Sequence, residues 1–138
     1  GTNGLSDDPS GTVDAIAQMV DNIRRHDKDI PIYIVNTIYW GDQEKIGTMV
    51  RQDGTAFLQG EFKNRSDKRI MDLMQAMAKK FEGKRNVELI PLALMHNSAE
   101  NFEDGDALHP GAAGYDQFAA VMYSVYCGTL PSMMENGG

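Results

Sequence analysis

Hydrophobic residues recur with helical spacing in three long segments of the chain, residues 12–25, 62–81 and 111–127. In each segment the apolar positions lie three and four residues apart, which predicts an amphipathic helix with one buried face. Gly83 and Gly128 stand just after the second and third segments. Because glycine is typical of the position that follows a helix, we expect these two helices to end there.

Two shorter apolar segments, residues 31–38 and 87–94, separate the three helices. They are rich in aliphatic residues and contain few polar ones, which predicts strands that are buried on both faces. Pro91 is expected to mark the end of the second strand or an irregularity in it. The alternating order predicts an α/β fold with a parallel sheet.

Two strands are few for such a core, because sheets in comparable proteins contain about five or six strands. A buried two-stranded parallel sheet would also leave backbone groups unpaired at both edges. We therefore expect a preceding N-terminal segment, a second chain or a symmetry-related copy of this chain to complete the sheet.

Two irregular segments follow the predicted strands. Residues 39–60 contain four glycines and open with Tyr39 and Trp40. Long loops in compact domains are commonly functional, and loops at the carboxyl ends of parallel strands carry the binding site. Tyr39 and Trp40 are therefore candidates for substrate binding, although Trp40 fits equally well as an aromatic side chain that covers the sheet edge. The second segment, residues 95–108, contains His96, which we expect near the mouth of a pocket.

Composition narrows the function classes. The chain has 138 residues, a formal net charge of −7 and a hydrophobic fraction of 41%, which suits one domain with a real core. We expect this domain to span residues 1–127 and residues 128–138 to form a tail. The acidic balance argues against a nucleic-acid binder, and no apolar run is long enough to span a membrane. Cys127 is the only cysteine, so an internal disulfide is impossible. The sequence assigns no cellular compartment.

The strongest candidate for chemistry lies at residues 106–110. Asp106 stands three residues before His109, and Pro110 suits the first position of the helix that follows. A histidine that a carboxylate can orient has the form of a general base. The same residues also fit a helix-capping aspartate beside a solvated histidine. A third interpretation is a metal site made by His96, Asp104, Asp106 and His109, although these residues lack a recognised ligand spacing.

Three short motifs together resemble the SGNH, or GDSL-type, serine esterases and acyl hydrolases. Residues 1–3 (Gly-Thr-Asn) resemble the third conserved block of that family. Residues 106–110 (Asp-Ala-Leu-His-Pro) resemble its fifth block, and residues 111–115 are similar to the helix start that follows it. The resemblance covers about residues 1–127. It implies the second half of a flavodoxin-like, three-layer α/β/α fold with a parallel sheet.

The resemblance also implies roles for three residues in the hydrolysis of a carboxylic ester through an acyl-enzyme. His109 would be the general base, Asp106 would orient it, and Asn3 would donate a hydrogen bond to the oxyanion. The substrate would be an acyl or O-acetyl ester of a small molecule or a glycan, and no metal or other cofactor would be needed.

One departure from the family pattern limits this interpretation: the chain has no Gly-Asp-Ser block. None of its serines follows an apolar strand in a tight turn. The nucleophile would then come from the missing N-terminal segment or from a second chain, and this chain alone would be inactive. The alternative is a non-catalytic binding or assembly module with the same fold.

Overall fold

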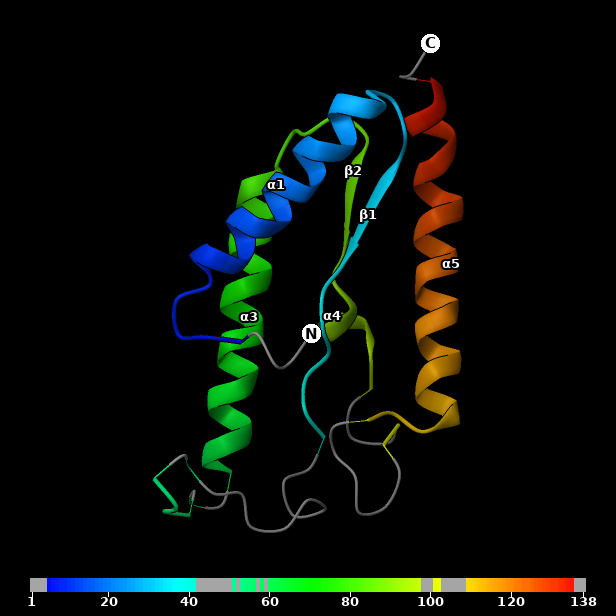
Figure 1. Ribbon diagram of the computed structural model, residues 1–138. Coiled ribbons are helices and arrows are strands. Elements are labelled where there is room, and N and C mark those ends of the chain that lie inside the picture. Colours follow the sequence, from blue (N-terminus) through cyan, green and yellow to red (C-terminus); the bar gives the residue numbers. More distant parts are fainter. Residues whose placement is uncertain are drawn as a thin grey trace.

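The structure is a computed structural model in which residues 5–41, 51, 53–56, 58, 60–97, 101–102 and 109–135 are described. Within these residues the chain forms four helices and a two-stranded sheet (Figure 1). The elements in chain order are α1 (Ser10–His26), β1 (Ile32–Val35), α3 (Glu61–Phe81), β2 (Val87–Ile90), α4 (Leu92–Met95) and α5 (Ala112–Glu135). The predicted α/β character is therefore confirmed.

The two strands run parallel, with Ile32 opposite Val87 and Val35 opposite Ile90. The N–H of Ile32 donates to the carbonyl oxygen of Asn86 at 2.9 Å, and the N–H of Asn36 donates to the carbonyl oxygen of Ile90 at 3.2 Å. In the described part of the chain, β2 is the only strand that pairs with β1. The prediction of a parallel sheet is confirmed.

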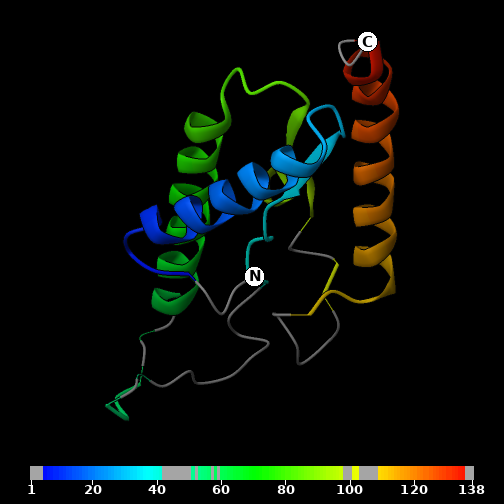
Figure 2. The same ribbon diagram turned by 45° about the horizontal axis from the view of Figure 1, so that its top comes forward.

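Helices lie on both sides of the strands. Figures 1 and 2 show α1 and α3 together on one side and α5 on the other. Alternate strand residues face the two sides, as the pleat of a strand requires. One core cluster joins α1 and α3 to the sheet, and it contains Val13, Val20, Leu73, Met77 and Phe81 with Ile32, Ile34, Val87 and Leu89 packed against it.

The face toward α5 is less well covered. Val35 remains 43% exposed, so the expectation that the strands are buried on both faces is wrong for β1. An apolar groove of about 320 Å³ separates the strands from α5. We call it the α5 groove, and its lining residues are Tyr33, Val35, Ile90, Met122, Tyr123 and Tyr126.

Both strands are shorter than the apolar segments suggested. β1 ends at Val35, and the side chain of the next residue, Asn36, turns inward to accept a hydrogen bond from the N–H of Ala93 at 3.4 Å. β2 ends at Ile90, because Pro91 has no N–H for the ladder and leads directly into α4. The predicted break at Pro91 is confirmed.

The last helix is longer than predicted. α5 continues through Gly128 to Glu135, so the expectation that it ends at Gly128 is wrong. The hydroxyl of Thr129 donates to the carbonyl of Val125 at 2.8 Å and lies 3.1 Å from the hydroxyl of Tyr33. Met133 is also buried. These contacts hold the extra turns against the rest of the protein.

None of the helices in the described residues is both long enough and apolar enough to cross a membrane.

Candidate functional site

His109 stands beside a closure between two segments of the chain. Phe102 and Pro110 form an antiparallel bridge, and the N–H of Gly111 donates to the carbonyl of Asn101 at 2.9 Å. We call these four residues the 101–111 clamp. Helix α5 begins at Ala112, so Pro110 pairs in the bridge and does not open the helix as expected. The clamp fixes the backbone on which His109 sits.

The first turns of α5 strengthen the clamp. The side-chain oxygen of Gln117 accepts hydrogen bonds from the amide of Asn101 and from the N–H of Asn97, the latter at 2.8 Å. Gly114 packs so closely that a Cβ atom there would lie 2.6 Å from Cβ of Pro110 and 2.7 Å from the carbonyl oxygen of Asn101. Only glycine allows this approach without a shift of the clamp.

The position of His109 suits a catalytic histidine. His109 is exposed and stands three residues before Ala112, where α5 begins. This start of α5 lies at the end of the molecule toward which both strands run (Figure 1). In parallel α/β sheets, ligands bind beyond the carboxyl ends of the strands. The structure therefore combines an exposed His109 with a clamp that holds the two residues after it, Pro110 and Gly111.

The other two predicted catalytic residues, Asp106 and Asn3, lie outside the described residues. The chain that follows Asn3 is anchored, because Asp7 forms ion pairs with Arg69 at 2.7 Å and Arg65 at 3.1 Å on α3. Hydrogen bonds from Arg69 and Arg65 hold the pKa of the Asp7 carboxyl well below its usual value. The proposed contacts of Asp106 and Asn3 with His109 stay predictions.

Tyr39 and Trp40 lie against α3. The N–H of Trp40 donates to the carboxylate of Asp67 at 3.2 Å, and the hydroxyl of Tyr39 contacts the sulfur of Met71 at 3.7 Å. Burial, with a smaller contribution from Asp67, raises the pKa of the Tyr39 hydroxyl. These contacts attach the segment after β1 to α3. A role of Tyr39 or Trp40 in substrate binding stays a prediction.

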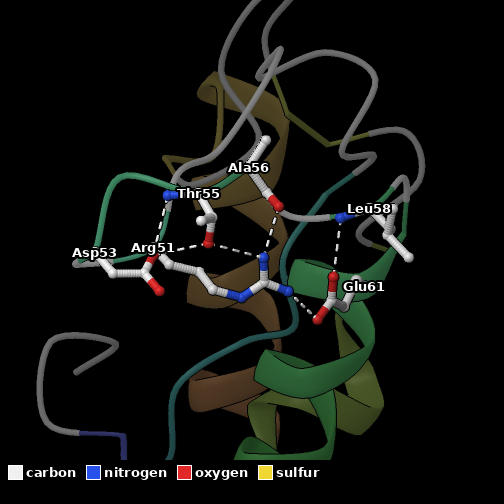
Figure 3. A network of polar contacts seen from close by, with 6 residues as sticks. All are labelled: Arg51, Asp53, Thr55, Ala56, Leu58 and Glu61. Atoms are coloured by element: carbon white, nitrogen blue, oxygen red, sulfur yellow. Dashed lines mark hydrogen bonds and ion pairs between the residues drawn. The ribbon is translucent and has the colours of Figure 1, made fainter.

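Part of the loop after Trp40 forms a tight turn at the start of α3 (Figure 3). The N–H of Arg51 donates to the carbonyl of Thr55 at 2.7 Å, and its guanidinium donates to the carbonyl of Ala56 at 2.6 Å and pairs with Glu61. The Glu61 carboxylate also accepts the N–H of Leu58 at 2.9 Å. This turn is fixed to α3 through Glu61.

Sequence reasoning misplaced His96. Only 8% of the residue is exposed, and its ring packs edge-on against Phe118 at 4.8 Å and Phe102 at 5.7 Å between ring centres. It therefore lies beneath the clamp and not at the mouth of a pocket. Neither ring nitrogen has a hydrogen-bond partner in the described part of the chain, and burial lowers the pKa of the imidazole.

Asn36 is a second buried polar residue that the sequence analysis did not single out. Its side-chain oxygen accepts the N–H of Ala93, whereas its side-chain nitrogen has no partner among the described residues. Buried polar groups without partners are rare and usually have a specific reason. A lone asparagine in an otherwise apolar strand segment was the available signal.

The structure does not test the metal-site interpretation, because Asp104 and Asp106 lie outside the described residues. Among the residues that are described, no group of three His, Cys, Asp or Glu side chains could hold a metal ion. Among the described residues, no serine lies in a turn at the end of a strand. Ser66 is buried on α3 and Ser124 lies on α5, as their helical pattern predicted.

Comparisons of the chain with protein-family models, curated proteins and solved structures gave no match. Any function must therefore be argued from the residues and their geometry.

Proposed function

We propose that this chain forms the base-bearing part of a serine-type hydrolase that cleaves carboxylic esters. The observation that carries the proposal is the clamp, which presents the exposed His109 at the carboxyl end of a parallel sheet. A histidine that must accept and return a proton needs an accessible ring on a backbone that does not move.

The mechanism assigns one step to each predicted residue. His109 takes the proton of a serine hydroxyl as that oxygen attacks the ester carbonyl, and it then protonates the leaving alcohol. Asp106 holds the imidazole in the required orientation. Asn3 donates its side-chain N–H to the oxyanion, and a donor of this kind contributes about 3 kcal/mol to catalysis. Water then releases the acyl group by the same proton transfers, and no metal ion takes part.

The serine would be supplied from outside this chain, on a segment that also completes the sheet. Two features of the described residues support this arrangement. The outer edge of β1 pairs with no strand in this part of the protein, and the α5 groove next to it exposes apolar side chains such as Tyr123, which is 70% accessible. An added strand would pair with the edge and cover the groove. The substrate would be an acyl or O-acetyl ester of a small molecule or a glycan.

One observation favours a second candidate function. The chain contains no Gly-Asp-Ser sequence, and its described serines lie on helices or in the segment before α1. If no partner segment supplies a serine, the same fold would serve as a non-catalytic binding or assembly module.

A fluorophosphonate probe, which labels activated serines covalently, distinguishes the two functions. We expect the complete protein, with its partner segment or chain present, to be labelled on that partner. His109→Ala should abolish the labelling because the serine then lacks its base, with a loss on the order of 10⁴-fold or more in rate.

His26→Ala is the matched control, because His26 is also an exposed histidine but ends α1, away from the clamp. Labelling should survive that change. A complete protein that the probe never labels, or labelling that His109→Ala leaves intact, would reject the esterase function and leave the binding module.

A further inference from the structure

A pocket with an excess of positive charge lies where α1 and α3 end and β2 begins, at the opposite end of the strands from His109 (Figure 1). Its volume is about 250 Å³. Five cationic residues and one carboxylate line it, although the chain as a whole carries a net charge of −7. The charged residues are Arg24, Lys28, Lys80, Lys84, Arg85 and Asp21.

Arg24 places a fixed charge in the wall of this pocket. Its guanidinium donates to the carbonyl oxygens of Ile30 at 2.6 Å, Asn86 at 2.8 Å and Arg85 at 3.3 Å. All three acceptors are neutral, so these bonds hold the guanidinium in place without cancelling its charge. Arg24 therefore keeps a positive charge at a fixed position in the pocket wall.

Lys28 and Lys84 add two charges that are also uncompensated. Neither ammonium group has a hydrogen bond or an ion pair among the residues that the structure describes. The two remaining cations differ, because Lys80 pairs with Asp14 and Arg85 pairs with Asp29, each at 3.0 Å. Within the described residues, three of the five positive charges thus lack a carboxylate partner.

Helix dipoles do not account for this arrangement. Cations in the last turn of a helix are favourable, which explains Arg24 on α1 and Lys80 on α3. Lys28, Lys84 and Arg85 lie beyond the ends of these helices, in the segments that lead to the strands. Together they enclose a concave site with an apolar floor that includes Phe81 and Val87.

We propose that this pocket binds a small phosphate-bearing anion. Several positive charges around one site favour a dianion over a single carboxylate, and lysine is a common point-charge partner of phosphate. The volume falls below the roughly 300 Å³ at which typical ligand pockets begin, which suits free phosphate or a small phosphomonoester. The site lies away from the clamp and does not depend on the esterase function.

Isothermal titration calorimetry on the purified chain at low ionic strength tests the proposal, with inorganic phosphate and phenyl phosphate as separate ligands. We expect saturable binding with one site per chain. Tighter binding of phenyl phosphate would identify an organic monoester as the ligand, because its ring would contact the apolar floor. Equal binding would identify free phosphate.

Three variants distinguish a built site from general attraction to positive charge. The double change Lys28→Gln/Lys84→Gln should weaken binding by at least about tenfold, since each lost charge-assisted contact has an effect of that order. Asp21→Asn should tighten binding because it removes the one negative charge at the site. Lys79→Gln is the matched control, because Lys79 is exposed on α3 next to Lys80 but does not line the pocket.

The proposal is overturned if neither ligand binds the unaltered chain at millimolar concentration. It is also overturned if Lys79→Gln weakens binding as much as the double variant does, or if Asp21→Asn has no effect.

Discussion

At the scale of single residues, His96 is a buried histidine that supports the clamp from below. Its ring packs against Phe102 of the clamp and Phe118 of α5, and both ring nitrogens are buried without a hydrogen-bond partner among the described residues. The neutral imidazole is tolerated there, whereas a charged one would lose its hydration without gaining a counter-ion among the described residues. The packing of the clamp therefore depends on the protonation state of this histidine.

This dependence predicts a loss of stability in mild acid. The folded protein lowers the pKa of His96, so below the ordinary value of about 6.5 the unfolded chain binds a proton that the folded chain does not. Stability should fall with decreasing pH by up to about 1.4 kcal/mol per unit, until the lowered pKa is reached. Urea unfolding between pH 7.5 and 5 measures the slope.

His96→Leu removes the titrating group, so its stability should vary less with pH than that of the unaltered chain. His26→Leu, at an exposed position, should keep the original slope. An unchanged slope in His96→Leu would show that another group causes the acid sensitivity.

At the scale of elements, α5 illustrates two different uses of glycine in one helix. Gly114 lies where the helix passes Pro110 and the carbonyl of Asn101, and a side chain there would collide with both. Gly128 lies farther along the same helix and has open space where its Cβ would be. The first glycine is required by a close approach, and the second only weakens the helix.

The two positions predict opposite effects of the same substitution. Gly114→Ala should destabilise the protein by about 1–3 kcal/mol, because Pro110 and the backbone of Asn101 cannot rotate away from the new methyl group. Gly128→Ala should stabilise it by about 0.5–1 kcal/mol, since alanine favours the helix and meets no neighbour. Thermal or urea unfolding of the two variants gives both signs, and a stabilising Gly114→Ala would contradict the close packing of the clamp.

The sequence predicted the elements well where periodicity was strong and poorly at their ends. The stripes of α1 and α3 were sufficient to place both helices within a few residues. The end of α5 could not be read in this way, because Gly128 is tolerated inside a helix whose last turns are held by the contact of Thr129 with Tyr33 and by the burial of Met133. These are tertiary contacts, which local sequence does not encode.

At the scale of the whole molecule, the sheet has an unequal environment on its two sides. Helices α1 and α3 lie on one side of the strands and α5 on the other (Figure 2). The first two cover their face with a shared core, while α5 leaves the groove beside which Val35 and Tyr123 are exposed. The unpaired edge of β1 lies beside this groove within the described residues. A segment that completes the sheet would pair with this edge and would also cover the groove.

Backbone amide exchange tests that arrangement without a catalytic assay. The amides of Ile32 and Asn36 donate to β2, so those of Tyr33 and Val35 point toward the opposite edge. In the chain alone we expect Tyr33 and Val35 to exchange faster than Asn36, as measured by NMR. Addition of the completing segment should protect both amides.

If Tyr33 and Val35 are already as protected as Asn36 in the chain alone, the edge is covered by this chain itself and no completing strand pairs there.

The candidate site was predictable only in part. The spacing of Asp106, His109 and Pro110 drew attention to the junction before α5, and the order of elements predicted that it lies at the carboxyl ends of the strands. The clamp was not predictable, because Asn101 and Gly111 are joined by a backbone hydrogen bond that leaves no trace in residue type. The burial of His96 was missed for the same reason, since its neighbours come from two separate segments.

Because of the clamp, the position of His109 does not depend on the length of the segment between Phe102 and His109. Asn101 and Phe102 are joined to Gly111 and Pro110, so the two ends of the intervening segment meet whatever lies between them. Lengthening a closed loop costs little, about 0.6 kcal/mol for each doubling. Residues inserted directly after Phe102 would keep Asp106 and His109 three positions apart and leave the histidine where it is. The segment between the clamp's two halves can therefore change in length while the position of His109 stays fixed.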